Sequence, residues 1–469
     1  MVRDDTAMSI AANYPGAVQS PAPSRIARAP GWPIVGVLPQ LRRDPLAFFA
    51  DLIHTPGQAV ELRLGFRRAL FPTTPGLIKH VLQDNARNYR KSDYVALLKP
   101  MLGDGIFLAE GDSWLAQRRT AAKGFQGFEY PRLVAAMNDA TVDMIARWDE
   151  QARLDRPVDL AEEMMRVTLD IILRALFSVP LDHRYEAVYE ALTFLLRDAE
   201  KRVWAIFNLP FGTPTPRNRR VAAAQKVIDD FVASVVADRQ REGKPRGDLL
   251  DVFIDAYADR PKDGPAPNLL IDEVRSFILA GHETTANALS WVWWVGEEHP
   301  EAIRGMREEI LSVMPEGDAN LDALRRLSYV GQVFQEAMRI YPPVWTMSRA
   351  AIADDNFEGI EISAGTNMIL CPYAIHRRPD IWEAPEEFRP ERFAAREERG
   401  ADRYAYFPFG GGPRRCLGEQ FALWEARVIL GHVLRRFDVT IEPGQSVLPE
   451  PMITLRPNGP MMARIRRRH

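Results

Sequence analysis

Residues Phe407–Gly418 read FPFGGGPRRCLG, and residues 419–437, which follow directly, read EQFALWEARVILGHVLRRF. The spacing of apolar residues in the second stretch predicts a helix, so Cys416 lies where a loop becomes a helix. The amino end of a helix carries partial positive charge, which lowers the pKa of a cysteine and stabilises its thiolate. Glycines before the cysteine let the backbone approach a flat group closely. The stretch predicts a thiolate that binds a soft metal, although these residues alone also allow a packed thiol without a ligand.

The chain has two cysteines, Cys416 and Cys371. Two are too few for a disulfide framework and are typical of a reducing compartment. Zinc does not suit Cys416, because no second cysteine and no spaced histidine pair lies near it in the sequence to complete a tetrahedral set. Cys371 falls in the strand-like run ILCPYAIHR, residues 369–377, which has no ligand pattern. We therefore predict that Cys371 is a core residue.

The apolar segment Leu269–Glu298 predicts a helix of about 30 residues, which at about 1.5 Å per residue is long enough to cross a whole domain. Within it, Ala280 and Thr284 share one helix face, and Glu283 is adjacent. Thr284 can play an ordinary structural role by bonding the carbonyl one turn earlier, or it can present its hydroxyl to a ligand. His282 lies off that face, and we expect it to be structural.

The rest of the chain predicts a mainly α protein with small β-sheets. Residues 26–110 mix short β-like runs with Pro and Gly, and residues 114–339 have mostly helical spacing. After Pro342, β-like residues 362–373 lead through a charged, Pro-rich coil to the cysteine loop. Residues 1–25 are expected to be a mobile leader.

Composition and charge narrow the class of protein. The chain is 46% hydrophobic and 26% charged, as an ordinary globular protein is. A formal net charge of -3 gives no reason to expect a nucleic-acid partner. The N-terminal residues lack the basic start and apolar core of a secretory signal. Because Glu283 interrupts the most apolar stretch, no membrane anchor is expected and the predicted location is cytoplasmic.

The cysteine loop resembles the haem-binding motif of the cytochrome P-450 superfamily, bacterial soluble type. The matching positions are Phe409, Gly412, Arg414, Cys416 and Gly418. Other family motifs follow the family's order along the chain: GDSWLAQRR at 111–119, AGHETT at 280–285, QEAMRIYPP at 335–343 and FRPERF at 388–393. The resemblance covers nearly the whole chain from about Pro30. It implies the mainly α family fold, with residues 26–469 forming a single haem domain.

The resemblance also implies roles for individual residues. Cys416 is expected to be the axial thiolate ligand of haem b, iron protoporphyrin IX. Further cofactor contacts are expected from Phe409, Gly412, Arg414, Gly418, Trp114, Arg118 and Arg349. The residues expected to activate oxygen and to deliver protons are Ala280, Gly281, Glu283 and Thr284. A buried charge network that holds the coil before the cysteine is expected from Glu336, Arg339 and Arg392, and His376 is expected to be structural or to lie near a propionate.

The implied reaction is O2-dependent hydroxylation of a lipophilic small molecule, such as a fatty acid, a terpenoid or a carotenoid-like compound. Electrons are expected from a separate, acidic ferredoxin or flavodoxin, which suits a basic patch on the cysteine side. That patch is expected to comprise Arg118, Arg119, Lys123, Arg414 and Arg415. Residues expected to line the substrate pocket are Phe107, Phe277, Val344, Trp345, Met347, Met452 and Ile453. Two rival functions share the cysteine ligand: a haem-based gas sensor and a peroxide-driven hydroxylase.

Overall fold

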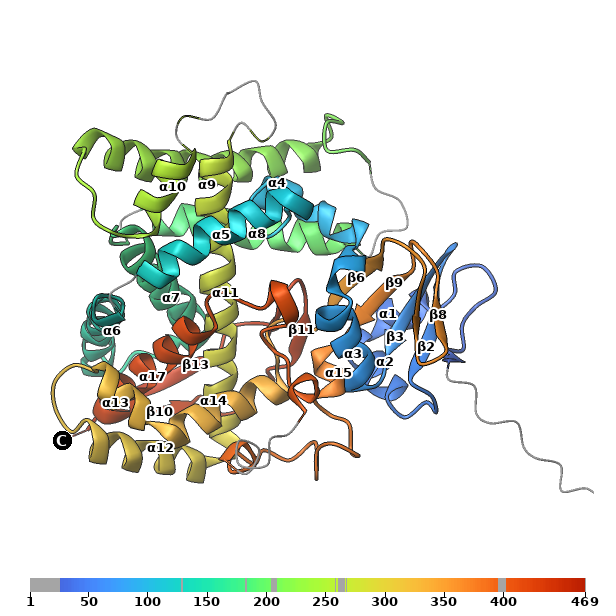
Figure 1. Cartoon of the computed structure of the whole chain (residues 1–469). Coiled ribbons are helices and arrows are strands. Elements are labelled where there is room, and N and C mark those ends of the chain that lie inside the picture. Colours follow the sequence, from blue (N-terminus) through green and yellow to red (C-terminus); the bar gives the residue numbers. More distant parts are fainter. Residues whose placement is uncertain are drawn as a thin grey trace, which may run out of the picture.

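The computed structural model describes residues 26–468 apart from 128–129, 182–183, 204–208, 258, 260–265, 267 and 395–401. The predicted leader, residues 1–25, lies outside the described residues. Helices form most of the molecule, and the strands of the largest sheet gather at one side of it, whereas β10 and β13 lie at the other side near α17 (Figure 1). The helices are α1 (Leu38–Arg43), α2 (Pro45–Leu52), α3 (Pro75–Lys79), α4 (Lys99–Leu102), α5 (Gly111–Gly127), α6 (Tyr130–Arg153), α7 (Leu160–Phe177), α8 (Tyr185–Val203), α9 (Pro216–Glu242), α10 (Leu249–Tyr257), α11 (Leu269–Glu298), α12 (Pro300–Val313), α13 (Leu321–Arg326), α14 (Ser328–Ile340), α15 (Pro372–Ile375) and α17 (Glu419–Arg436).

The strands form one larger sheet and three small ones over the part of the chain that the structure describes. The six-stranded sheet has the order β1-β2-β3-β9-β6-β4, and a three-stranded sheet has the order β10-β13-β5. Two further pairs are β11-β12 and β7-β8. The strands are β1 (Ile26–Arg28), β2 (Ala59–Leu64), β3 (Arg67–Pro72), β4 (Tyr89–Lys91), β5 (Val158–Asp159), β6 (Met347–Ala351), β7 (Asp355–Phe357), β8 (Ile360–Ile362), β9 (Asn367–Leu370), β10 (Phe437–Ile441), β11 (Pro449–Pro451), β12 (Leu455–Pro457) and β13 (Met462–Arg467).

The register of the larger sheet brings distant parts of the chain together. β2 and β3 form an antiparallel hairpin, and β3 runs parallel to β9, with Ala69 opposite Asn367. β6 joins the far side of β9 and pairs with β4, which places Lys91 opposite Arg349. Two cations from segments far apart in the sequence thus lie side by side.

Helix α11 runs through the middle of the molecule, from the side of α9 and α10 to the side of α12 (Figure 1). It packs along α7 and also contacts α14, so most of its residues are buried. Its Trp291 stacks on Tyr341 with ring centroids 4.2 Å apart. Pro300 follows the helix and opens α12, because proline fits the first turn of a helix but not its interior. The predicted bounds of this helix, Leu269–Glu298, are confirmed.

One predicted element is wrong in part. Residues 362–373 were predicted to hold β-like segments. Ile362 ends β8 and Asn367–Leu370 form β9, but the last residues of the range enter the short helix Pro372–Ile375. The proline at the first helical position accounts for the change, since its fixed φ suits a helix start and it donates no hydrogen bond to a sheet. Within the described residues, no helix has the length and the apolar character needed to cross a bilayer.

Candidate active site

The cysteine loop is a tight turn that only glycine can make at one position. Gly412 has φ +62°, and a Cβ there would fall on the carbonyl oxygen of Leu82. The Cys416 N–H donates to the Phe409 carbonyl at 3.0 Å, which folds the loop back on itself. The Gly418 N–H points at the Cys416 sulfur and favours its thiolate. Gly418 is also the residue that precedes α17, so the predicted position of the cysteine at a loop-to-helix junction is confirmed.

Cys416 is exposed even though protein atoms surround its thiol, so its side chain faces an interior space rather than the outer surface. Burial raises the pKa of this thiol, while the charges of Arg118 and Arg415 act to lower it. The sequence predicted a lowered pKa from the helix end alone. In the structure burial opposes that effect, because loss of water around the sulfur disfavours its charged form.

A stripe of α11 is open in a helix that is otherwise largely buried. Ala280 is exposed, and Phe277, Gly281 and Thr284 are half-buried. Three of them, Phe277, Ala280 and Thr284, recur at helical spacing, so they share one face. The Thr284 hydroxyl donates to the Ala280 carbonyl at 2.8 Å. This is the structural hydrogen bond that the sequence allowed as one of two roles for Thr284. The Thr284 side chain is nevertheless partly exposed on the open face of the helix.

Glu283 does not turn toward the hydroxyl beside it. Its carboxylate accepts a hydrogen bond from Thr454 at 2.6 Å, and Thr454 in turn accepts from Asn287 at 3.1 Å. Glu283 is buried, and burial raises the pKa of its carboxyl. The predicted convergence of a small residue, an acid and a hydroxyl therefore holds for Ala280 and Thr284 only. His282 is buried and its Nδ1 lies 3.1 Å from the Ile278 carbonyl, as a structural residue would.

Cations from β4, β6 and the cysteine loop gather in one place and could hold the predicted haem propionates. Arg414 pairs with Glu110 at 2.5 Å, and its guanidinium lies over the Trp114 ring at 4.2 Å. Burial and the charge of Arg414 lower the pKa of Arg349 to about 10. Burial and the same charge lower the pKa of Lys91 to about 7.

This cluster has more positive than negative charge. The charge of Arg414 lowers the pKa of both Lys91 and Arg349. The carboxylate of Glu110 acts in the opposite direction on both. Depressed pKa values of this kind mark cations that lack sufficient counter-charge. A group with two carboxylates would supply it, so the donor set fits the two propionates of haem b. Arg118 lies on the cysteine side, where its guanidinium donates to the Arg415 carbonyl at 2.7 Å.

The predicted charge network is present and buried. Arg339 donates to both carboxylate oxygens of Glu336, at 2.8 and 2.9 Å, and neither side chain is exposed. Arg392 reaches the same carboxylate at 3.0 Å. The remaining guanidinium N–H groups donate to backbone carbonyls of the coil before the cysteine loop, namely those of His376, Glu383, Ala384, Pro385 and Glu387.

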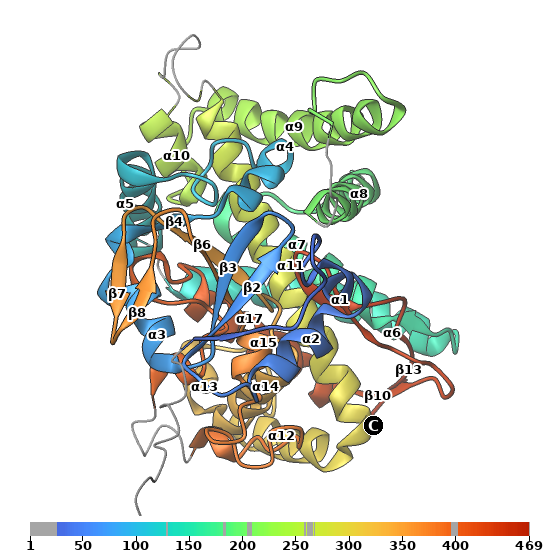
Figure 2. The same cartoon turned by 90° about the vertical axis from the view of Figure 1, so that its right-hand side faces the viewer.

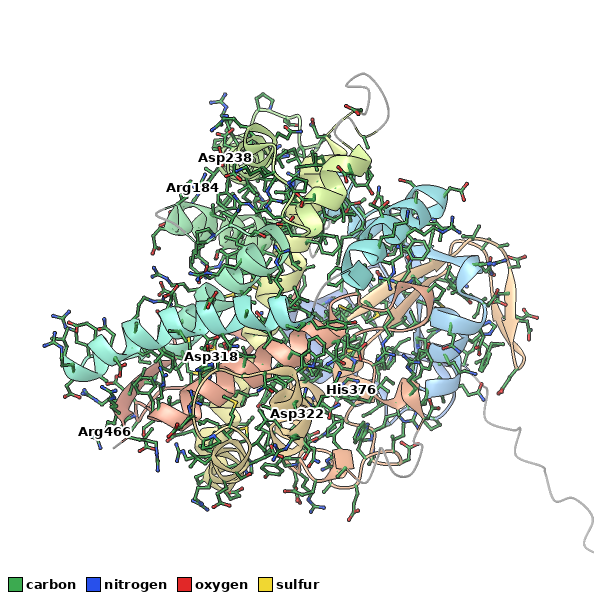
Figure 3. All side chains as sticks on the ribbon, turned by 60° about the vertical axis from the view of Figure 1, so that its left-hand side comes forward. Arg184, Asp238, Asp318, Asp322, His376 and Arg466 are labelled. Carbon is green, nitrogen blue, oxygen red and sulfur yellow. The ribbon has the colours of Figure 1, made fainter. Side chains whose placement is uncertain are left out.

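His376 links this network to the cysteine loop. Its carbonyl accepts from Arg339, while its ring nitrogen Nε2 accepts from the Phe407 N–H at 3.0 Å. The ring also contacts Tyr406, with centroids 5.0 Å apart. In Figure 3 His376 lies inside the molecule, whereas Asp238 and Arg466 lie near its edges. His376 is therefore a structural residue that holds the start of the loop.

The residues expected to line a substrate pocket divide into two groups. Phe107 is exposed, and Phe277, Val344, Met347 and Ile453 are half-buried, so their place in a substrate pocket stays a prediction. The other two, Trp345 and Met452, are buried.

Trp345 is a core residue, which corrects its predicted place in the pocket. Its ring packs near Phe49, with centroids 6.3 Å apart, and its N–H donates to the Met452 carbonyl at 2.7 Å. Met452 is 5% exposed and Trp345 is 2% exposed. Cys371 lies in the same core, where its thiol donates to the Trp345 carbonyl at 3.2 Å, and burial raises its pKa to about 12. The predicted contrast between the two cysteines is confirmed for Cys371.

The predicted basic patch is smaller than expected. Arg414 turns inward to Glu110 and Trp114, and Arg415 forms an ion pair with Glu419. Arg119 and Lys123 remain exposed, one turn apart on α5. The sequence showed five basic residues but not which of them face solvent.

Two residues of the site were missed by sequence reasoning. Lys91 lies in no motif, and only the pairing of β4 with β6 brings it to Arg349. Glu425 is a fully buried acid on α17, and burial raises the pKa of its carboxyl well above the usual value. An acid among the apolar residues FALWEARVIL was the available signal for Glu425.

Comparison with known proteins agrees with this geometry. The family model described as cytochrome P-450 matches residues 27–463. Cyclooctatin synthase of Streptomyces melanosporofaciens is 30% identical over 91% of this chain and 92% of its own length. Cyclooctat-9-en-7-ol 5-monooxygenase of the same organism is 31% identical over 89% of this chain and 90% of its own. Pentalenene oxygenase of Streptomyces avermitilis is 28% identical over 91% of this chain and 94% of its own.

A solved structure shares the fold. The crystal structure of the cytochrome P-450DA haem domain superposes with a TM-score of 0.81, covering 95% of this chain and 98% of that chain at 24% identity. The predicted fold class is thus confirmed, and the cofactor is haem b. Family match, full-length relatives and fold together place this chain in the cytochrome P-450 family of haem-thiolate monooxygenases.

Proposed function

We propose that this chain hydroxylates a lipophilic small molecule of the terpenoid class, using O2 and electrons from a separate acidic ferredoxin or flavodoxin. The observation that carries the proposal is the open stripe of α11, where apolar Phe277 and Ala280 lie beside the hydroxyl of Thr284. A gas sensor needs the cysteine but not such a stripe. Of the three substrate classes expected, terpenoids are favoured by relatives that are named for oxidation of pentalenene and of cyclooctat-9-en-7-ol.

We assign the following roles to residues of this chain. Cys416 would hold the haem iron, and Lys91, Arg349 and Arg414 would hold the propionates. When bound, the haem supplies the iron at which dioxygen is activated. Ala280, on the open stripe, would leave space for dioxygen because its side chain is a single methyl group. Gly281 would serve packing instead, because a Cβ there would meet Ile172 of α7 at 2.5 Å. Thr284 would hold a proton at its Oγ1 for the oxygen side, and Glu283, bonded to Thr454, would position that part of α11.

Domain organisation and location belong to the same proposal. Residues 26–469 would form one haem domain, and the family model that matches residues 27–463 supports this extent. Both cysteines are free, which supports a reducing, cytoplasmic environment.

Two matched cysteine variants test the haem-thiolate site. Carbon monoxide added to the reduced protein should give a strongly red-shifted Soret band, and Cys416→Ala should abolish it. Cys371→Ala removes the other free thiol, which is buried in the core and donates to the Trp345 carbonyl. This variant should keep the band. Retention of the band in Cys416→Ala, or its loss in Cys371→Ala alone, would contradict the assignment.

A ligand screen tests the substrate class. Cyclic terpene hydrocarbons and alcohols should displace water from the iron and shift the Soret band toward the high-spin position. Saturated fatty acids of similar carbon number serve as the comparison, because they are equally lipophilic but carry a carboxylate. A shift with the fatty acids and none with the terpenes would move the assignment to fatty-acid hydroxylation.

A further inference from the structure

Three large apolar side chains protrude from one end of the molecule. Phe66 is 92% exposed, Ile34 is 67% exposed and Trp32 is 63% exposed. Scattered exposed apolar residues are ordinary, but aromatic and branched side chains gathered at one place indicate contact with a partner. We call Trp32, Ile34 and Phe66 the apolar tip.

The backbone holds the apolar tip together. Trp32 and Gly36 exchange two hydrogen bonds, of 2.9 and 3.0 Å, so residues 32–36 form a tight turn with Ile34 at its end. The Gly65 N–H donates to the Val35 carbonyl at 3.2 Å, which fastens this turn to the β2–β3 turn that carries Phe66. Gly36 has φ +63°, and a Cβ there would fall on the Arg63 carbonyl. The close approach of the two turns therefore depends on glycine.

Arginines surround the apolar tip. Residues 26–43 and 61–68, which form both turns and their flanks, contain six arginines and one acid, Glu61. Glu61 is shared by two of the arginines, Arg28 at 3.4 Å and Arg68 at 3.8 Å, both of which are mostly exposed. These two stretches together carry a net positive charge although the whole chain has a net charge of -3. The six arginines are Arg28, Arg42, Arg43, Arg63, Arg67 and Arg68.

We propose that the apolar tip docks on the surface of an anionic lipid bilayer. Tryptophan and phenylalanine side chains settle in the headgroup region, and arginines around them are attracted to anionic lipids. A second copy of this chain does not suit the tip, because a symmetric contact would bring the two sets of arginines together. In Figure 2 β2 and β3 face the viewer beside α1, so this end is not covered by the helical body. Docking here would bring the enzyme to the phase in which a lipophilic substrate accumulates.

Vesicle binding by the haem-loaded full chain tests the proposal. The protein should co-sediment with vesicles of phosphatidylglycerol mixed with phosphatidylcholine and bind phosphatidylcholine alone more weakly. The triple variant Trp32→Ser, Ile34→Ser, Phe66→Ser should lower the partition coefficient on the mixed vesicles by about tenfold or more, because each change removes apolar area from the interface. Arg67→Gln with Arg68→Gln should weaken binding to the mixed vesicles only, and added salt should do the same.

A matched triple variant serves as control. Val142→Ser, Leu154→Ser, Leu311→Ser changes three other exposed apolar residues, on or beside α6 and α12, elements on the opposite side from β2 in Figure 1. It should bind vesicles as the parent chain does. Equal loss in both triple variants, or no binding by the parent, would overturn the proposal.

Two further outcomes would also overturn it. The first is a change in oligomeric state in the tip variant, which would assign the tip to self-association. The second is slower reduction by a soluble donor without vesicles, which would assign it to a protein. Because vesicle binding is measured without substrate, its failure leaves the proposed hydroxylase activity untouched.

Discussion

At the scale of single residues, the cysteine loop depends on glycine because glycine has no Cβ atom. Gly412 combines a positive φ with a carbonyl oxygen where a Cβ would be, so two separate penalties fall on one position. Gly444 has φ +81° but open space around it. A comparison of Gly412 with Gly444 therefore separates the cost of backbone strain from the cost of a steric clash.

Gly412→Ala should therefore cost more than Gly444→Ala. Both changes force alanine into the left-handed region, which costs about 1–2 kcal/mol. Only Gly412→Ala must also move the Leu82 backbone, so its haem content after purification should fall while Gly444→Ala keeps a full complement. Haem-to-protein ratios and melting temperatures measure both effects. Equal haem content in the two variants would show that the loop can shift.

Thr284 supports a prediction on coupling. Thr284→Ala removes the hydroxyl from the open stripe, and the product formed per electron consumed should fall several-fold because proton delivery contributes about 10²-fold or more to such steps. Thr284→Ser keeps the hydroxyl and should restore most of the coupling. Unchanged product per electron in the alanine variant would favour a gas sensor or a peroxide-driven enzyme.

His282 makes stability depend on pH. Burial lowers its pKa from 6.5 to about 4, so the unfolded chain binds the proton more readily than the folded one. The contribution of this residue to stability is complete above about pH 6.5 and is lost as the pH falls toward 4. Between pH 7.5 and pH 5 the loss amounts to about 2 kcal/mol. His432, whose pKa burial also lowers to about 4, acts in the same direction.

Chemical unfolding at the two pH values measures this effect. His282→Gln should reduce the difference in unfolding free energy between them by about 2 kcal/mol. His54→Gln changes an exposed histidine and should leave the difference as it is. If both variants keep the parent's pH dependence, His282 is not neutral in the folded protein.

At the scale of elements, α14 is tied to the coil before the cysteine by one carboxylate. Glu336 accepts from Arg339, from Arg392 and from the Arg389 N–H at 2.9 Å. Such a buried network stabilises little relative to apolar packing, but removal of one partner leaves the others buried without counter-charge. The network therefore fixes the path of the coil rather than adding much stability.

Glu336→Gln should destabilise the protein by about 3–5 kcal/mol and lower haem retention. Asp230→Asn on α9 breaks an exposed ion pair with Lys226, whose side chains are 73% and 62% exposed, and should cost under about 1 kcal/mol. Unfolding midpoints of the two variants give the comparison. A small effect of Glu336→Gln would mean that the coil is held by its backbone bonds alone.

At the scale of the whole molecule, surface charge decides how a redox partner approaches. Arg119 and Lys123 are exposed on α5, the helix whose Arg118 reaches the backbone of the cysteine loop. If the donor is acidic, as proposed, this positive pair would steer it and raise its rate of association, most strongly at low salt.

Charge reversal tests that approach. Arg119→Glu with Lys123→Glu should slow reduction by an acidic ferredoxin about tenfold or more at low salt. High salt should reduce the difference in rate between this variant and the parent. Arg219→Glu with Lys226→Glu on α9 makes the same change in net charge and should leave the rate near that of the parent. Stopped-flow reduction measures both. Equal slowing by the two variants would indicate a general charge effect rather than a docking patch.

The sequence by itself determined the family, the bounds of α11, the separate environments of Cys371 and Cys416, and the Glu336–Arg339 pair. The bounds of α11 follow from helical spacing and Pro300, which act over a few residues, whereas the family, the ligand role of Cys416 and the buried Glu336–Arg339 pair were implied by the resemblance of short motifs. Only the tertiary structure decided that Glu283 bonds Thr454, that Arg414 turns inward, that Trp345 fills the core and that Lys91 joins Arg349. Each of these contacts joins segments far apart in the chain, and the direction in which a side chain points across such a contact depends on how whole elements pack.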